Sequence, residues 1–225
     1  MKRYYTSVFC LLSIVTLLFV SSCKMGRFVY YNFANITDYK VFPSRPLKHD
    51  SVVFQFNTTN TPKAPKKLTV KDNEIPFDGY LANSNTVAFL IIKNDTIQYE
   101  NYFNGYDKES IVASFSMAKS ITSILIGCAI DDKLIGSVDE PVVQYVPELK
   151  KNGFDEKLTI KHVLQMKSGI KFSESYSDPF GDAATYYYGT NLRKAISKMK
   201  PLQEPDKSFE YSSGDTQLLG LVLER

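Results

Sequence analysis

Tryptophan is absent from this 225-residue sequence, which contains only two histidines and three cysteines. His49 and His162 lie far apart and lack the spacing of metal ligands, so a metal site is not expected. Cys10 falls in the apolar N-terminal segment, which leaves Cys23 and Cys128 for the rest of the chain. These are too few for a disulfide framework, and we expect Cys128 to be a small core residue on the apolar face of a helix.

A large excess of charge of either sign is also missing. Lysine and arginine together number 27 and aspartate and glutamate 24, which gives a formal net charge of +3. A surface so nearly neutral offers no electrostatic basis for binding nucleic acid. The apolar fraction of 44% is typical of a globular chain, and we find no internal repeat.

The N-terminal segment is typical of an exported protein. Lys2 and Arg3 form a basic start, and the apolar stretch 8–20 is shorter than the roughly 20 residues that a membrane-spanning helix needs. Small residues then lead directly to Cys23, an arrangement that resembles a bacterial lipoprotein signal. The resemblance implies that residues 1–22 are a signal peptide and that Cys23 carries the lipid.

Lipidation would attach the protein to a membrane of the bacterial cell envelope. Lys24 follows the cysteine, and by analogy with known sorting signals this favours the outer membrane. Without residues 1–22 the net charge falls from +3 to +1, because that segment contains two basic residues and no acidic ones. The alternative is a plain secretory signal with a chance cysteine.

Composition divides the remaining chain into two parts. Residues 23–67 are predicted to be a lipid anchor, stalk and N-terminal arm. Within them, 28–56 is rich in tyrosine and interrupted by proline, and 57–67 has the composition of an exposed connector. Residues 68–225 are predicted to form one domain.

Strands precede helices in the predicted domain. The apolar runs 86–92 and 96–103, joined by the turn-forming residues 93–95, predict a β-hairpin. Helical spacing follows after Ser116 and in three later segments: 159–166 with Gly169 as its C-terminal signal, 191–199, and 216–225. Strands followed by a run of helices predict an α+β fold.

Ser116 and Lys119 combine a nucleophile with a base at the predicted start of a helix. Their spacing of three residues puts both side chains on one helical face. A hydroxyl is a weak nucleophile until a neighbouring base takes its proton, which a desolvated neutral lysine can do. The helix N-terminus adds free backbone N–H groups and partial positive charge. The pair therefore predicts a serine hydrolase.

The tetrapeptide Ser-x-x-Lys alone is a weak signal, because it also occurs at Ser21, Ser168 and Ser197. Only the copy at Ser116 is followed by an amphipathic helix, whose apolar residues are Met117, Ile121, Ile124, Leu125 and Cys128. The alternative interpretation is that Ser116 caps an ordinary helix and that Lys119 is solvated.

A second candidate segment contains Tyr211 and Ser213, which are predicted to lie on a loop before the last helix. A tyrosine held beside a lysine can favour its phenolate form and relay protons, and Ser213 could hydrogen-bond the same lysine. The alternative is that Tyr211 is a core aromatic residue with a satisfied hydroxyl.

The order of these segments resembles the class C β-lactamase-like serine hydrolase family. That family includes β-lactamases, D-alanyl-D-alanine carboxypeptidases, esterases and 6-aminohexanoate-dimer hydrolases. The resemblance covers residues 86–225 and rests on the hairpin, the helix at Ser116, segments 138–142 and 158–170, and Tyr-Ser-Ser at 211–213. It implies the penicillin-recognising α+β fold, an antiparallel sheet with a helical subdomain, for 68–225. Ser-Met-Ala-Lys-Ser and Tyr-Ser-Ser look closest to the esterase and oligomer-hydrolase branch.

The resemblance also implies roles for four residues. Ser116 would be the acylated nucleophile, Lys119 its proton acceptor and Tyr211 the group that protonates the leaving group. Ser213 stands where the family has a polar substrate-binding residue, often asparagine, and no cofactor is implied. The reaction would transfer an acyl group from an ester or amide to Ser116 and then to water. β-Lactam, D-amino peptide, short ester and oligoamide substrates stay open, as does the oligomeric state.

Some features depart from the family pattern. The late strand with a Lys/His-Thr/Ser-Gly motif, which supplies the family's second oxyanion donor, is absent here, and Lys167-Ser168-Gly169 lies earlier, after the predicted helix 159–166. The chain also stops inside a helical pattern at Arg225, so we expect an N-terminal piece of a longer protein. Asp206 replaces a usual glycine, and Tyr186 to Tyr188 could either contact substrate or pack the helices. The alternative functions are a non-catalytic penicillin-binding-like module and an inactive truncated remnant.

Overall fold

A computed structural model of the chain describes residues 24–31, 33–48 and 54–225. The predicted signal peptide and Cys23 lie outside these residues, and the domain boundaries stay predictions. None of the described helices is both long enough and apolar enough to cross a membrane.

The described chain forms two compact units. The first consists of residues up to Ile36 together with 114–225, and the second of residues 37–113. The second unit contains the strands and the first contains most of the helices, so the predicted α+β class is confirmed.

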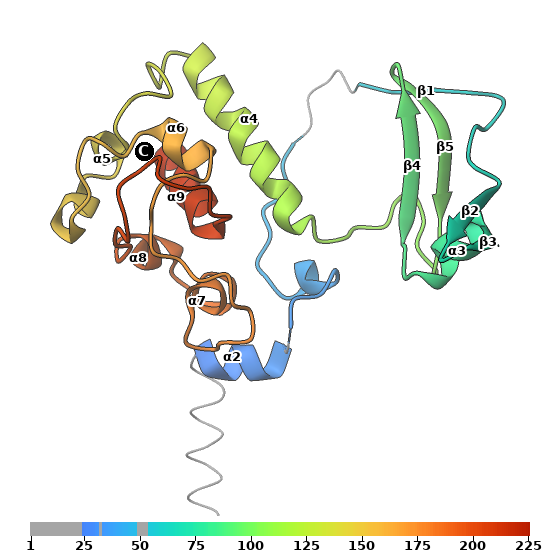
Figure 1. The fold of residues 1–225 in the computed structure, drawn as a ribbon, viewed down its shortest axis with the longest axis horizontal. Coiled ribbons are helices and arrows are strands. Elements are labelled where there is room, and N and C mark those ends of the chain that lie inside the picture. The colour runs from blue at the N-terminus through green and yellow to red at the C-terminus, as the bar shows by residue number, and fades with distance from the viewer. Residues whose placement is uncertain (1–23, 32, 49–53) are drawn as a thin grey trace, which may run out of the picture. The chain divides into compact units, whose positions relative to one another are not determined.

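The second unit contains the predicted hairpin. β4 (Ala88–Lys93) pairs in antiparallel fashion with β5 (Thr96–Tyr102). Asn94 and Asp95 connect them with φ values of 49° and 52°, the left-handed geometry of a two-residue hairpin turn. β1 (Asn57–Thr58) lies parallel to β5, which gives the sheet the order β1-β5-β4 (Figure 1).

The second unit also contains elements that the sequence pattern did not reveal. β2 (Lys67–Val70) and β3 (Asn73–Pro76) form a short antiparallel hairpin, and α3 (Phe77–Asn83) follows at once. A 3-10 turn at Asp38–Lys40 precedes them in the chain. The two strands have four residues each, too few for alternation of apolar and polar residues to stand out from connector composition.

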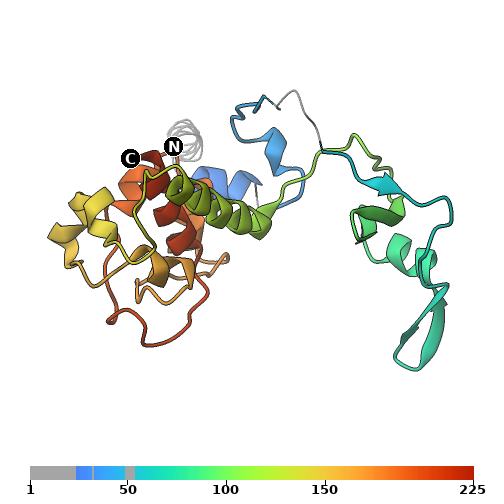
Figure 2. The same cartoon turned by 90° about the horizontal axis from the view of Figure 1, so that it is seen from above.

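The first unit is built from helices (Figures 1 and 2). In chain order these are α2 (Lys24–Tyr31), the 3-10 turn η2 (Phe115–Met117), α4 (Ala118–Asp131), α5 (Val142–Tyr145), the 3-10 turn η3 (Pro147–Asn152), α6 (Ile160–Leu164), α7 (Asp182–Tyr188), α8 (Leu192–Ile196) and α9 (Ser213–Glu224).

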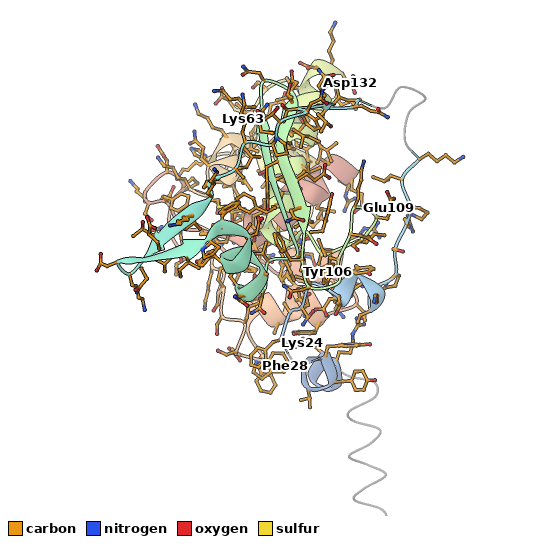
Figure 3. The ribbon with its side chains drawn as sticks, turned by 90° about the vertical axis from the view of Figure 1, so that its right-hand side faces the viewer. Lys24, Phe28, Lys63, Tyr106, Glu109 and Asp132 are labelled. Atoms are coloured by element: carbon orange, nitrogen blue, oxygen red, sulfur yellow. The ribbon has the colours of Figure 1, made fainter. Side chains whose placement is uncertain are left out.

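α2 packs against α7. Lys24 and Phe28 both project from α2 (Figure 3). The Lys24 Nζ donates a hydrogen bond to the Thr185 Oγ1 at 2.8 Å, and the Phe28 ring lies edge-on to that of Tyr188 with centroids 5.3 Å apart. The N-terminal arm therefore begins with a helix that belongs to the helical unit.

α9 contacts four other helices of the unit, α4, α6, α7 and α8. Its apolar residues are buried and join a single core, to which burial of each large side chain contributes about 1.5–3 kcal/mol. The most deeply buried members of that core are Ile126, Val142, Val146, Leu149, Leu158, Ile160, Val163 and Leu218. The packing around α9 thus fixes the position of its N-terminus.

The apolar stripe predicted for α4 is not the face that enters this core. Ile126 is the α4 side chain that is 1% exposed, whereas Ile121 and Ile124 are 58% and 61% exposed. Cys128 is exposed too, so the prediction that it is a core residue was wrong. The helix is apolar around most of its circumference, and spacing therefore selected the wrong side. No described residue buries the stripe.

α6 begins at the predicted cap. The Thr159 side chain accepts from the N–H of His162, and the His162 ring accepts from the N–H of Thr159, which forms a capping box. The helix ends earlier than predicted, at Leu164, and Met166 already takes a left-handed conformation with a φ of 54°. Gly169 has a φ of 68°, and a Cβ there would clash with the carbonyl oxygen of Gln203, so only glycine fits this position.

The last two helices differ from the predicted ranges. Asn191 caps α8, which ends before 199. Ser212 caps α9 by accepting from the N–H of Asp215 at 3.1 Å. Ser213 is therefore the first residue of α9, and its predicted place on a loop was wrong, because the glycine after it hid the start of the helix.

Asp206 keeps the turn that a glycine would form. Its φ is 63°, a conformation that aspartate tolerates better than most residues. Its N–H donates to the carbonyl oxygen of Lys167 at 2.8 Å, and its Oδ1 accepts from the Lys167 Nζ at 2.8 Å. The departure from the family pattern therefore leaves the turn intact.

Asp215, in the first turn of α9, is a buried acid that is 1% exposed. The Ser168 Oγ donates to its Oδ1 at 2.8 Å, and its Oδ2 has no hydrogen-bond partner among the described residues. Burial raises the pKa of Asp215 to about 7, although hydrogen bonds from Ser168 and Ser212 act in the opposite direction. The carboxylates of Glu210 and Glu174 add to the increase.

Asp215 is expected to make stability depend on pH. Its pKa is raised in the fold, so its contribution is present below the unfolded value of about 3.8 and is lost as pH rises towards 7. The free energy of unfolding should fall by up to about 1.4 kcal/mol per pH unit over this interval. Urea unfolding from pH 4 to 8 should show a flatter dependence for Asp215→Asn, with the exposed Asp139→Asn as control. Equal slopes in the Asp215→Asn and wild-type proteins would contradict the expectation.

Candidate active site

Ser116 lies on the 3-10 turn η2, which runs directly into α4. The residue before it, Phe115, has a φ of 44°, an uncommon conformation for a bulky side chain. Met117 is the N-cap of α4, and no side chain forms a capping hydrogen bond there. The alternative interpretation of Ser116 as an ordinary helix cap is therefore wrong, and its hydroxyl is available for other partners.

The structure brings the four residues predicted for the site together. The Lys119 Nζ lies 3.2 Å from the Ser116 Oγ and 3.0 Å from the Ser213 Oγ. The Tyr211 hydroxyl donates to the Ser116 Oγ at 2.8 Å. Ser116 and Lys119 come from η2 and α4, whereas Ser213 begins α9 and Tyr211 lies just before it. The contact between these helices therefore assembles the group.

Hydrogen bonds and charge within the group lower the pKa of Tyr211. The hydrogen bond with Ser116 is the largest cause that lowers the pKa of Tyr211, and Lys119 lowers it further through a hydrogen bond and its positive charge. Partial burial opposes the shift. The Lys119 Nζ also lies 5.1 Å from the centroid of the tyrosine ring. Tyr211 is thus a hydrogen-bonded member of the site, not a core residue, and 45% of it is exposed.

Glu174 is a site residue that the sequence pattern did not reveal. Its Oε1 accepts from the backbone N–H of Ser213, and its Oε2 accepts from the Ser213 Oγ at 3.2 Å. The Tyr176 hydroxyl donates to the same Oε2 at 3.3 Å. Glu174 lies in an irregular serine-rich segment without periodicity, so nothing local distinguishes it from a surface carboxylate.

Glu174 sets the direction of the hydrogen bond between Ser213 and Lys119. An ionised carboxylate can only accept hydrogen bonds, so Ser213 donates its single hydroxyl proton to Glu174. The Ser213 oxygen must then accept from the Lys119 Nζ. The Lys119 Nζ is thereby held between the hydroxyls of Ser213 and Ser116, at 3.0 and 3.2 Å.

A cavity of about 570 Å³ opens beside Ser116. Ser116, Lys119 and Ser213 lie on its wall, and Tyr211 does not. The other lining residues are Ala34, Phe115, Ala118, Thr122, Phe172, Tyr176, Ala183, Tyr186, Tyr187, Thr216, Gln217 and Gly220. We call this space the Ser116 cavity.

The three consecutive tyrosines of α7 divide between the two roles that the sequence left open. Tyr186 and Tyr187 line the Ser116 cavity. Tyr188 is 3% exposed and packs against α2 through Phe28.

Across residues 24–31, 33–48 and 54–225, we find no group of three His, Cys, Asp or Glu side chains arranged to hold a metal ion.

Comparison with known proteins places these observations in a family. Residues 77–225 match the family model described as Beta-lactamase. The chain is 28% identical over 152 residues to the 6-aminohexanoate-dimer hydrolase of Paenarthrobacter ureafaciens, a match that covers 62% of this chain and 38% of that protein.

A solved structure is also similar. It is that of a candidate 6-aminohexanoate-dimer hydrolase from Bacillus anthracis, with a TM-score of 0.62 and 22% sequence identity. The match covers 77% of this chain and 48% of that chain. The chain therefore spans less than half the length of either relative, and the structural likeness bears on the fold alone.

Glu174 is expected to act on the site through Ser213. Glu174→Gln should slow the labelling of Ser116 by a serine-directed phosphonate about 10- to 100-fold, the factor for a lost hydrogen bond to a charged group. Ser213→Ala should have a similar effect, and the double variant should be no slower than either single variant. Stopped labelling reactions followed by mass spectrometry would give the rates.

The matched control is Glu156→Gln, which removes an exposed carboxylate paired with Lys150 in the same unit. Its labelling rate should equal that of the wild-type protein. Multiplicative effects of Glu174→Gln and Ser213→Ala would show that the two side chains act independently and would contradict the interpretation.

Proposed function

From the premise that this chain belongs to the beta-lactamase family, we propose that it is a serine hydrolase that cleaves an ester or amide through an acyl-enzyme on Ser116. The observation that carries the proposal is the convergence of Lys119 and Tyr211 on the Ser116 Oγ, at 3.2 and 2.8 Å. A hydroxyl with two proton-transfer groups at hydrogen-bond distance is the arrangement that nucleophilic catalysis requires.

Acylation would begin with proton transfer from Ser116. Neutral Lys119 takes the hydroxyl proton while the Ser116 Oγ forms a bond to the carbonyl carbon of the substrate. The carbonyl oxygen becomes an oxyanion, for which the backbone N–H of Ser116 is one donor. A donor of this kind contributes about 3–4 kcal/mol to stabilisation of the transition state.

Collapse of the tetrahedral intermediate would release the leaving group. The bond from carbonyl carbon to the ester oxygen or amide nitrogen breaks, and Tyr211 gives its proton to that departing atom. Lys119, which lies against Tyr211, can return a proton to the phenolate. Water then attacks the acyl-enzyme and yields a carboxylic acid and free Ser116.

The ester and amide branch of the family is favoured over the β-lactam branch. The Ser-Met-Ala-Lys-Ser and Tyr-Ser-Ser motifs of this sequence support it, as does similarity to a protein named 6-aminohexanoate-dimer hydrolase. Hydrolysis of a short ester or oligoamide by this mechanism would need no cofactor.

Ser116 is expected to be the residue that is acylated. In the full protein, a serine-directed phosphonate should label a single serine, and Ser116→Ala should abolish the labelling. Lys119→Met should slow it about 10²- to 10⁴-fold, since a base in this position contributes that factor. Peptide mapping by mass spectrometry would identify the labelled residue. Labelling that persists in Ser116→Ala would remove Ser116 from the proposed role.

Ser120→Ala is the matched control, because Ser120 is exposed on α4 in the turn after Ser116 and its side chain hydrogen-bonds to none of the four site residues. It should label at the wild-type rate. A chromogenic ester then separates turnover from binding: sustained release of product supports a hydrolase. A single burst without turnover supports a non-catalytic binding module.

We also propose that Cys23 anchors the protein in the cell envelope. The basic start, the apolar stretch 8–20 and the small residues before Cys23 support this proposal. The anchor would hold the enzyme on the bacterial membrane, with the outer membrane favoured by Lys24. Its substrates would then be small molecules or short peptides and oligoamides that reach the envelope.

Lipidation at Cys23 is expected to control membrane association. In cells supplied with radiolabelled palmitate, the wild-type protein should incorporate label and partition into detergent. Cys23→Ser should lose both properties, because the thiol that takes the diacylglyceryl group is gone. Cys128→Ser should retain both and serves as the control. Equal labelling of the Cys23→Ser and wild-type proteins would refute the anchor.

A further inference from the structure

Most of the wall of the Ser116 cavity differs in chemistry from the three site residues, Ser116, Lys119 and Ser213, that also line it. Among the fifteen described residues that line it, Lys119 is the only charged one, and no carboxylate is included. Away from Ser116, Lys119 and Ser213, the wall is formed mainly by aromatic rings and small side chains. A wall of that composition favours hydrocarbon over charged groups.

The aromatic wall is fixed by its own packing. The ring of Phe172 lies edge-on to that of Tyr186, with centroids 5.2 Å apart. Ala183, one helical turn earlier on α7, is 4% exposed. Partial burial also raises the pKa of Tyr186. This part of the cavity wall is therefore preformed by packing between its own residues.

Gly220 on α9 enlarges the cavity. A Cβ at this position would meet no heavy atom within 4 Å, so the missing side chain leaves open space at the wall. A larger side chain at this position would therefore project into the space beside the cavity wall.

The direction of the cavity assigns it to one side of the scissile bond. Tyr211, the proposed donor to the leaving group, contacts the Ser116 Oγ but does not line the cavity. The leaving group therefore departs on the Tyr211 side. The acyl group, which stays on Ser116, is the part of the substrate that can enter the cavity.

We propose that the Ser116 cavity binds an uncharged aliphatic acyl chain of medium length, so that the enzyme selects apolar acyl esters or amides. This inference rests on the proposed function and names its substrate class. A volume of about 570 Å³ lies within the range of sites for small ligands and exceeds what an acetyl group needs. An acyl chain ending in an ammonium group would find no carboxylate on the described lining. Glu174 lies outside that lining and is hydrogen-bonded to Ser213.

The test is a chain-length series on the full protein. p-Nitrophenyl esters and matching p-nitroanilides from acetyl to octanoyl should show kcat/KM rising about fourfold per added methylene, the factor for burial of one methylene group. Gly220→Leu should lower the ratio of octanoyl to acetyl kcat/KM at least tenfold, because its side chain occupies the cavity.

Gly127→Leu is the matched control. Gly127 lies inside α4, and a Cβ there also meets nothing within 4 Å, but this residue does not line the cavity. Its octanoyl-to-acetyl ratio should equal that of the wild-type protein. Loss of the ratio in Gly220→Leu alone supports the inference and separates it from any effect of leucine in a helix.

The contrary outcomes distinguish the two proposals. Hydrolysis that depends on Ser116 but does not rise with chain length would overturn the acyl-chain inference and leave the hydrolase intact. Equal ratios in Gly220→Leu and Gly127→Leu would do the same. Absence of Ser116-dependent cleavage across both series would overturn the proposed function together with the inference.

Discussion

The contact between α4 and α9 is the constraint on which the rest of the helical unit depends. Leu218 of α9 and Ile126 of α4 belong to the same core, and both are almost fully buried. At the N-terminal ends of the two helices, the Lys119 Nζ meets the Ser213 Oγ at 3.0 Å. The burial of apolar surface is non-directional, whereas the hydrogen bond has a defined geometry. Together, the packing holds the two helices against each other and the hydrogen bond fixes Lys119 relative to Ser213.

The start of α9 serves several structural purposes over a few residues. Ser212 caps the helix, Ser213 bridges Lys119 and Glu174, and Asp215 reaches back to Ser168 in the interior. A change of the chain in this stretch therefore alters helix capping, the site and a buried polar contact at once. Polar groups in such a connected network are strengthened by one another and are costly when one loses its partner.

Several structural features that depend only on residues close together in the sequence were predicted correctly. The hairpin turn at Asn94-Asp95, the Thr159 cap and the Ser116–Lys119 spacing all follow from local geometry and agree with the structure. The role of Glu174 was not predictable, because folding brings it to Ser213 across 39 residues. The buried face of α4 was also missed, since a helix that is apolar on most sides does not encode which side its neighbours will cover.

The backbone conformation of Phe115 affects how the protein can evolve greater thermal stability. A bulky residue held at a φ of 44° stores about 1–3 kcal/mol of conformational strain. Selection for thermal resistance alone would replace it with glycine, which adopts this conformation freely. Glycine would also loosen the turn on which Ser116 is displayed. Thermostable relatives that keep a large residue here would indicate that a rigid nucleophile was retained at the expense of heat tolerance.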